Sequence, residues 1–327
     1  MHVRPVAESI TGATNVCGCV LKMIEKLFLA LCAVVLIGYL DGVQGLRLAE
    51  QKCEEYRKMV ASLTPKVTGR TNEFDTPPNG MAARDGEFPH QVRVGQWFYE
   101  DEETAFILRC SGALISERYV LVAGQCFWTL GDEAVSLGRH DYRRNSSFPE
   151  VIIEREDMVY YPNFDELRKE AYDNIALLRL AKPVTFTSHI HPACLWTAEN
   201  SQLPEKLTAT GFTRGKILND TADTHLVKLR ITRIPNEQCT REYAGNARYP
   251  NGFTESLLCA ESPVEWKESC EGDAGGLLQT LETSPSGDFY RLIGLEGKGQ
   301  ECDQPQKRLT YTNVGQYLDW IESIVWK

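Results

Sequence analysis

The sequence predicts an all-β domain that ends in one helix and is held by disulfides. From about Gln91, short runs rich in β-branched and aromatic residues are separated by polar or Gly/Pro/Asn turns, a spacing typical of β-sandwiches and β-barrels. An N-terminal apolar run followed by an even number of cysteines indicates an oxidising compartment. Near the C-terminus, apolar residues recur on one helical face: Val314, Tyr317, Leu318, Ile321, Ile324 and Val325.

The composition excludes several functional classes. The chain has 327 residues, of which 43% are hydrophobic and 24% charged, so it can bury a core and is not disordered as a whole. Its formal net charge of −10 argues against nucleic acid as a partner, because a nucleic-acid binder needs a basic face to neutralise phosphates. The same charge argues against docking on acidic membranes.

The N-terminal apolar run predicts secretion. Leu27–Leu40 is uncharged, follows Lys22 and Lys26, and precedes the small residues Val43 and Gly45, which suit a peptidase site. A membrane-spanning helix usually needs roughly 20 apolar residues, so this run is short for a permanent anchor. We therefore expect a cleaved signal peptide and no stable membrane insertion afterwards, and the alternative is a signal-anchor.

These features divide the chain into four parts. Because Met23 directly precedes the signal-like stretch, residues 1–22 are interpreted as an upstream extension that the working protein lacks, and residues 23–45 as the signal peptide. Residues 46–78 form a polar lead segment, punctuated by proline, with Cys53 as its single cysteine. The β-rich domain occupies residues 79–327.

The cysteines are interpreted as disulfides. Signal cleavage removes three of the eleven, Cys17, Cys19 and Cys32, and leaves an even number for the oxidising compartment. No C-x-x-C pair remains and no histidine clusters with the cysteines, so neither a metal site nor a cofactor is expected. Asn145 and Asn219 begin glycosylation triplets in polar stretches, although such triplets are also common by chance.

Three motifs carry a family resemblance. Cys110–Cys126 (CSGALISERYVLVAGQC), Tyr172–Leu180 (YDNIALLRL) and Glu268–Leu278 (ESCEGDAGGLL) resemble the histidine, aspartate and serine segments of chymotrypsin-like S1 serine proteases. The resemblance runs from about Asn79 to Lys327. It implies two six-stranded antiparallel β-barrels with a C-terminal α-helix and a site between the barrels.

The resemblance also implies how the cysteines pair. The expected disulfides are Cys53–Cys194, Cys110–Cys126, Cys239–Cys259 and Cys270–Cys302. Spacing alone does not select them, because eight cysteines allow 105 pairings. The lead segment and the flank Gly86–Val92 look like secreted arthropod serine proteases and their homologues. The clip module of many such proteins needs six cysteines, so we expect none in residues 46–78.

All three positions of the catalytic triad are predicted to be substituted. Gln125 stands at the histidine position, and a carboxamide cannot act as a general base near pH 7. Ala274 stands at the serine position and offers no nucleophile. Asn174 adjoins the isoleucine of the aspartate motif. Asp173 is displaced by one position, which on an extended backbone turns its side chain to the opposite face, so it is only a weak candidate for rescue.

The rest of the implied site is partly kept. The backbone N–H groups of Gly272 and Ala274 could still form an oxyanion hole. Glu268 stands where trypsin-like members carry an aspartate that attracts basic residues. Leu309 replaces a glycine of the pocket wall, and Lys298 stands in a pair that normally lines the cleft. A filled pocket is therefore expected, either by drift after catalysis was lost or by selection for a blocked site.

The sequence as a whole predicts a catalytically inactive serine protease homologue, secreted, that binds extracellular proteins such as proteases or their substrates. The resemblance implies a regulatory part in an extracellular cascade, for example in innate immunity. The alternatives are an endopeptidase with residual or unconventional activity and a structural secreted glycoprotein. The acidic run Glu100–Glu103 has two interpretations, a solvated hairpin tip or a partner-binding site.

Overall fold

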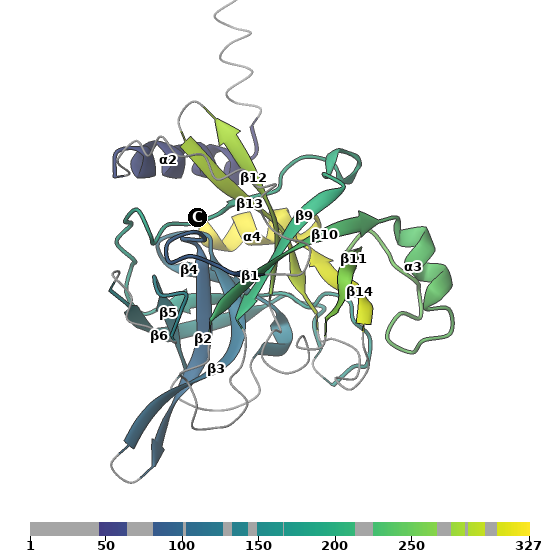
Figure 1. Ribbon diagram of the computed structural model, residues 1–327, viewed down its shortest axis with the longest axis horizontal. Coiled ribbons are helices and arrows are strands. Elements are labelled where there is room, and N and C mark those ends of the chain that lie inside the picture. Colours follow the sequence, from purple (N-terminus) through teal and green to yellow (C-terminus); the bar gives the residue numbers. More distant parts are fainter. Residues whose placement is uncertain are drawn as a thin grey trace, which may run out of the picture. The chain divides into compact units, whose positions relative to one another are not determined.

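In the computed structural model, the chain separates into two compact units, Met1–Arg47 and Leu48–Lys327. The residues that the structure describes are 46–63, 81–100, 103–126, 133–142, 149–165, 167–212, 225–266, 276–284, 287–297 and 306–327. All helices and strands named below belong to the second unit (Figure 1).

The first half of this unit folds into a closed six-stranded antiparallel barrel in the order β2-β3-β4-β7-β6-β5. Its strands are β2 (Gln91–Glu100), β3 (Glu103–Leu114), β4 (Tyr119–Val122), β5 (Glu133–Leu137), β6 (Val151–Tyr160) and β7 (Ala176–Leu180). Alternate residues of these strands point inward, as the two-residue period of a strand requires. The barrel core includes Val92, Val94, Leu114, Val122 and Leu178.

The second half forms another six-stranded antiparallel barrel in the order β9-β10-β11-β14-β13-β12, closed where β12 pairs with β9. Its strands are β9 (Lys206–Phe212), β10 (Leu226–Ile234), β11 (Leu257–Trp266), β12 (Leu277–Ser284), β13 (Gly287–Glu296) and β14 (Gln306–Asn313). Two short strands join its edges: β1 (Met81–Ala82) pairs with β10, and β8 (Cys194–Leu195) pairs in parallel with β13. The prediction of two six-stranded barrels is confirmed.

The predicted C-terminal helix is present and begins with a tighter turn. A 3₁₀ segment, η5 (Val314–Tyr317), leads into α4 (Leu318–Val325), and the Asn313 side chain accepts a hydrogen bond from Gly315 N at the start of η5. The apolar face of α4 packs into a cluster that also contains Leu121 of the first barrel and Leu292 of the second. The helix therefore covers apolar residues that both barrels supply.

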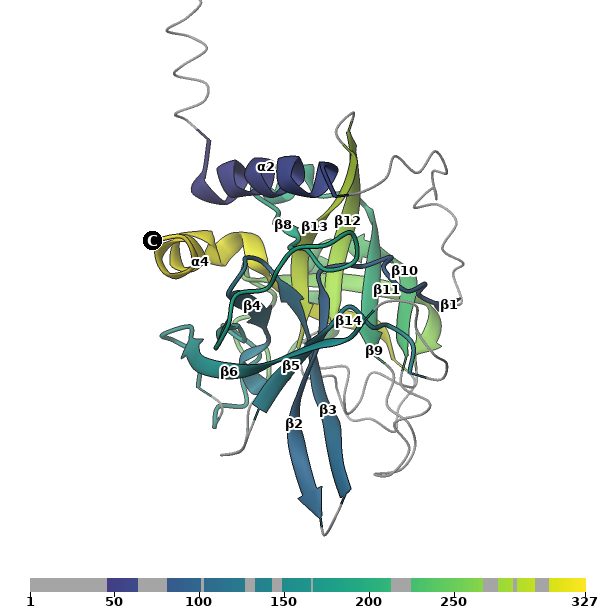
Figure 2. The ribbon, with the colours of Figure 1, turned by 90° about the vertical axis from the view of Figure 1, so that its left-hand side faces the viewer.

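A helix in the lead segment was not predicted. Helix α2 (Leu48–Ala61) lies beside α4 and the β12–β13 hairpin, as both views show (Figures 1 and 2). Its buried residues recur at helical spacing: Ala49, Cys53, Tyr56, Arg57 and Val60. This stripe was the available signal, but it is narrow and contains an arginine and a tyrosine, so the segment has the composition of a polar linker. A second short helix, α3 (Asn236–Glu242), was also not predicted.

The structure contains disulfides at three of the four pairs that the resemblance implies. They are Cys53–Cys194, Cys110–Cys126 and Cys239–Cys259, with Cα–Cα separations of 5.0, 5.7 and 6.5 Å. The first joins α2 to β8, and the second joins β3 to the 3₁₀ turn η2 (Gly124–Cys126). The expected fourth pair, Cys270–Cys302, lies outside the described residues. In the part of the chain that the structure describes, no helix is both long enough and apolar enough to cross a membrane.

Candidate functional site

Gln125 is placed by a short turn that is held on both sides. It is the central residue of η2, and the next residue, Cys126, forms the disulfide with Cys110 within β3. Within the turn, Cys126 N donates to Ala123 O at 3.1 Å. A Cβ atom on Gly124 would lie 2.9 Å from a ring carbon of Phe164, so glycine lets this ring approach the turn.

Asn174 reaches Gln125 from the segment that leads into β7. Its Oδ1 accepts a hydrogen bond from Gln125 N at 3.0 Å, and its Nδ2 donates to Gln125 Oε1 at 2.9 Å. Asn174 is only 5% exposed, so these bonds satisfy polar atoms that have little access to water. A neutral pair of carboxamides therefore occupies the two positions that the resemblance assigns to the catalytic histidine and aspartate.

Asp173 has a different partner. Its backbone φ is +57°, in the left-handed region that aspartate tolerates better than most residues. Its carboxylate accepts a hydrogen bond from Tyr317 Oη at 2.9 Å. Burial, together with this carboxylate, raises the pKa of Tyr317, so the hydroxyl remains a donor at ordinary pH. Asn174 therefore contacts Gln125, whereas Asp173 contacts Tyr317 of η5.

A cavity of about 430 Å³ opens beside this amide pair. Segments from both barrels line it: Phe164, Asp165 and residues 168–171 before β7, Ala247 and Arg248 after α3, and Thr310 to Thr312 on β14. At its rim, Arg168 forms an exposed ion pair with Asp165 at 3.3 Å. The cavity combines apolar walls with charged groups of both signs, an arrangement that suits a protein or peptide segment better than a purely apolar ligand.

Leu309 occupies interior space on β14. It is 5% exposed, faces Ala260 across the β11–β14 ladder and packs in the same core cluster as Leu229 and Leu278. The neighbouring cavity, lined by Leu309, Gly211 and Glu296 among others, has a volume of only about 30 Å³. The leucine side chain therefore fills volume that a glycine at this position would leave empty.

The sequence did not point to some residues that shape this site. Thr312 donates from Oγ1 to Asn174 O at 3.2 Å, so β14 of the second barrel helps to place the amide pair. Phe164 packs on the Gln125 turn and stacks on Tyr160 with ring centroids 5.6 Å apart. Both lie outside the family motifs, and no sequence signal separates them from ordinary core residues.

Other predicted site positions lie outside the described residues. They are Glu268, Gly272, Ala274, Lys298, Asn145 and Asn219. Among the residues that the structure describes, no group of three or more His, Cys, Asp or Glu side chains could hold a metal ion.

The chain is similar in sequence to a known protein family and to several known proteins. The trypsin family model matches residues 78–321. The chain is 30% identical over 299 residues to serine protease snk of Drosophila melanogaster, an alignment that covers 86% of this chain and 66% of that protein. It is 31% identical over 278 residues to phenoloxidase-activating factor 1 of Holotrichia diomphalia, an alignment that covers 80% of this chain and 73% of that protein. It is 25% identical over 302 residues to CLIP domain-containing serine protease B4 of Anopheles gambiae, and this alignment covers 85% of this chain and 82% of that protein. With its two barrels and a match that spans most of its length, the chain belongs to the trypsin family of serine proteases.

Proposed function

We propose that this protein is a catalytically inactive, secreted homologue of trypsin-like serine proteases that serves as a binding or regulatory module in an extracellular protease cascade. The observation that carries the proposal is the hydrogen-bonded amide pair of Gln125 and Asn174. A serine nucleophile in this fold needs an imidazole to take and return its proton and a carboxylate to orient that imidazole. Two carboxamides supply neither function near pH 7.

The sequence adds a second reason for inactivity. Ala274 stands between Gly-Asp and Gly-Gly, where the family motif has its serine, and a methyl group cannot attack a carbonyl. The effects of triad losses are far from additive, and a loss of the complete triad costs about 10⁶-fold in kcat in the subtilisin example. Backbone donors alone leave a rate too low for a physiological protease.

The proposed role in a cascade is supported by the relatives. Two of them are named phenoloxidase-activating factors of Holotrichia diomphalia. The cavity of about 430 Å³ beside Gln125 lies within the size range of ligand pockets. We infer that extracellular proteases or their substrates bind this protein without being cut. Within this role, neither a metal ion nor another cofactor has a part.

The first experiment tests inactivity. The purified protein is treated with a fluorophosphonate probe, which labels activated serine nucleophiles, and the matched variant is Ala274→Ser, which supplies the missing hydroxyl. We expect no labelling of either protein, because Gln125 cannot activate the new serine. Stoichiometric labelling of the unmodified protein would instead establish the endopeptidase alternative.

The second experiment tests the role in a cascade. The protein is added to extracellular fluid in which a zymogen cascade is triggered, and the rate of zymogen cleavage is measured with and without it. We expect the rate to change in proportion to the amount added, although the protein itself carries no activity. An unchanged rate over a wide concentration range, with no protease or substrate captured on the immobilised protein, would favour the structural glycoprotein.

A further inference from the structure

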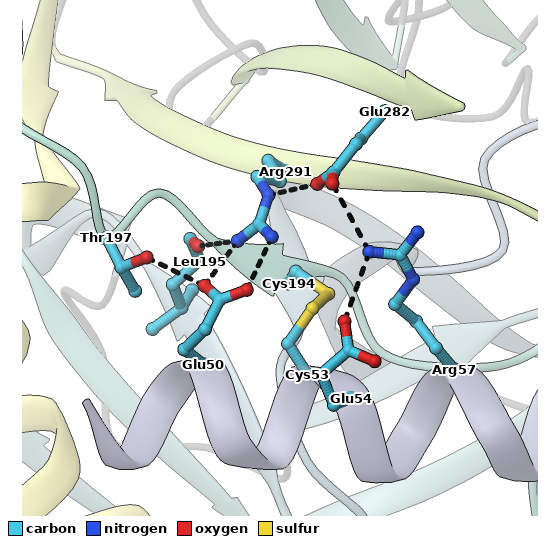
Figure 3. Close-up of polar contacts among 9 residues, drawn as sticks. All are labelled: Glu50, Cys53, Glu54, Arg57, Cys194, Leu195, Thr197, Glu282 and Arg291. Carbon is cyan, nitrogen blue, oxygen red and sulfur yellow. Dashed lines mark hydrogen bonds and ion pairs between the residues drawn. A yellow bond between two sulfur atoms is a disulfide. The ribbon is translucent and has the colours of Figure 1, made fainter. Parts of the chain in front are cut away.

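Helix α2 is attached to the second barrel by a partly buried pair of charges. Arg291 on β13 donates to both carboxylate oxygens of Glu50 at 2.7 Å, a two-point contact that fixes both side chains (Figure 3). Thr197 Oγ1 donates to the same carboxylate at 2.7 Å, and Arg291 also donates to Leu195 O at 3.1 Å. Both carboxylate oxygens of Glu50 therefore have a partner outside α2.

The charge contact continues along the helix. Glu282 on β12 accepts from Arg291 and also from Arg57 of α2, the latter at 3.4 Å. Arg57 is 5% exposed and also pairs with Glu54, one turn earlier in α2, at 3.5 Å. Figure 3 shows the resulting alternation of acidic and basic groups across the gap between α2 and the β12–β13 hairpin. Glu50 and Arg57 of α2 thus both form ion pairs with the β12–β13 hairpin.

Neighbouring residues of the same buried face of α2 contact the first barrel and the C-terminal segment. Tyr56 donates from Oη to Glu117, in the loop between β3 and β4, at 3.1 Å, and it accepts a hydrogen bond from Trp326 Nε1 at 3.0 Å. Its ring meets Phe186 edge to face, with centroids 5.5 Å apart. At the start of the helix, Ala49 N donates to Glu322 of α4 at 3.0 Å. Helix α2 therefore contacts both barrels and α4.

The disulfide lies in the middle of these contacts. Cys53 and Cys194 are each 2% exposed and pack with Tyr56, Val60 and Phe289 in one apolar cluster. The polar contacts of Glu50 and Arg57 lie on α2 on either side of Cys53, and none of them depends on the sulfur–sulfur bond. A disulfide alone would anchor one residue of the helix, whereas the observed contacts extend from Ala49 to Val60.

The charges stay ionised over a wide pH range. Burial by itself raises the pKa of Glu50, but hydrogen bonds from Arg291 and Thr197 outweigh burial and hold that pKa below its ordinary value. Burial by itself lowers the pKa of Arg291, but the hydrogen bonds to Glu50 and Glu282 outweigh burial and hold that pKa above its ordinary value. Removing one partner would leave the others charged and partly buried, which is far more costly than losing an exposed ion pair.

From these contacts we propose that α2 is a strap, defined as residues 48–61, that holds the two barrels and α4 together by its own non-covalent contacts. The disulfide is then a second attachment and not the only one. It follows that a cut anywhere between residues 64 and 80 yields a two-chain protein in which α2 keeps its place, and that the lead segment is a permanent part of the folded domain and not a releasable propeptide.

Hydrogen exchange followed by mass spectrometry tests the strap in the intact, disulfide-bonded protein. We expect the amides of α2 to be protected almost as strongly as those of β12 and β13, because the helix opens only with the domain. In Arg291→Gln, the exchange rate of the α2 amides should rise about tenfold or more, whereas the exchange rates of amides in the first barrel should stay unchanged. The matched control is Arg308→Gln, an arginine of the same barrel whose carboxylate partners, Glu242 and Glu261, lie away from α2.

A second measurement removes the covalent link. A specific protease site is placed within residues 64–80 of a variant that combines Cys53→Ala and Cys194→Ala, and the cleaved protein is examined by native mass spectrometry. We expect the α2 fragment to stay bound. Separation of the fragment, or α2 amides of the unmodified protein exchanging as fast as those of an isolated helix, would overturn the proposal. If the cysteine-free variant does not fold, the exchange measurement on the intact protein decides alone.

Discussion

Asn174 and Gln125 share two hydrogen bonds, one from the Asn174 side chain to Gln125 Oε1 and one from Gln125 N to Asn174 Oδ1. The two bonds join these residues directly, and the pair carries no charge. A catalytic imidazole and carboxylate would have to hold charge in the same place during turnover. The contact with Gln125 N is made by an oxygen that asparagine and aspartate both possess, so this part of the architecture does not require a carboxylate.

The first prediction concerns the stability of this pair. Replacing Gln125 by alanine leaves Asn174 Nδ2 buried without its acceptor, and an unsatisfied buried donor costs about 1–3 kcal/mol. We expect the free energy of unfolding to fall by that amount, measured by urea denaturation. The control is Arg168→Ala, which removes an exposed side chain at the rim of the same cavity and should change the free energy by no more than about 0.5 kcal/mol. Equal stability of the two variants would contradict the role of the pair.

The second prediction concerns Leu309. Truncation to alanine deletes three buried carbons from a packed cluster, so the free energy of unfolding should fall by about 2–5 kcal/mol, depending on how far the site relaxes. The matched control is Leu167→Ala, because Leu167 is 88% exposed and its truncation should be nearly neutral. Thermal melts of both variants give the comparison. A Leu309→Ala protein as stable as the Leu167→Ala protein would show that the packing of Leu309 does not contribute to the free energy of unfolding.

The barrels and the amide pair were predictable from the sequence for different reasons. Strand alternation and turn residues predicted the β-rich architecture from local chemistry, whereas the number of strands and the meeting of Gln125 with Asn174 came only from the family resemblance. These two residues are far apart in the chain, and no periodicity joins them. Their hydrogen bonds depend on the pairing of β7 with β4, the strand that leads into η2, which is a property of the closed barrel.

Helix α2 shows what the sequence could not predict. Its polar composition is typical of a linker, and isolated helices of this length are marginal in water. The helix is stabilised by partners more than one hundred positions away, such as Arg291 and Glu282. Phe164 and Thr312 were missed for the same reason, since their part in the site comes from contacts that only the folded chain brings together.

The third prediction is a loss of stability in acid. Burial lowers the pKa of His90 to about 3 and that of His191 to about 4, against an ordinary value of 6.5, and a charge on His191 further lowers the pKa of His90. Because both pKa values are lower in the folded state, the neutral rings stabilise the protein above pH 6.5. That contribution is lost as the pH falls from about 6.5 through about 4 and then 3. At about 1.4 kcal/mol per pKa unit, the two shifts together correspond to at most roughly 8 kcal/mol.

A variant separates these histidines from general acid unfolding. In His191→Gln, a neutral side chain replaces a ring that must gain a proton on unfolding, so the free energy of unfolding should fall less steeply between pH 6.5 and 4. Leu167→Ala, which changes an exposed side chain that carries no titratable group, is the control and should keep the slope of the unmodified protein. Parallel pH profiles for all three proteins would exclude a contribution from His191.

The fourth prediction ranks two disulfides. Cys53 and Cys194 are 141 positions apart in the chain, whereas Cys239 and Cys259 are 20 apart. In the chain-entropy model, a cross-link that closes a longer loop removes more freedom from the unfolded state, and the difference here is roughly 1–2 kcal/mol. We therefore expect Cys53→Ala with Cys194→Ala to lose more free energy of unfolding than Cys239→Ala with Cys259→Ala. Urea denaturation of the two double variants measures the ranking, and the reverse order would mean that native-state contacts around one disulfide, and not loop closure, set its contribution.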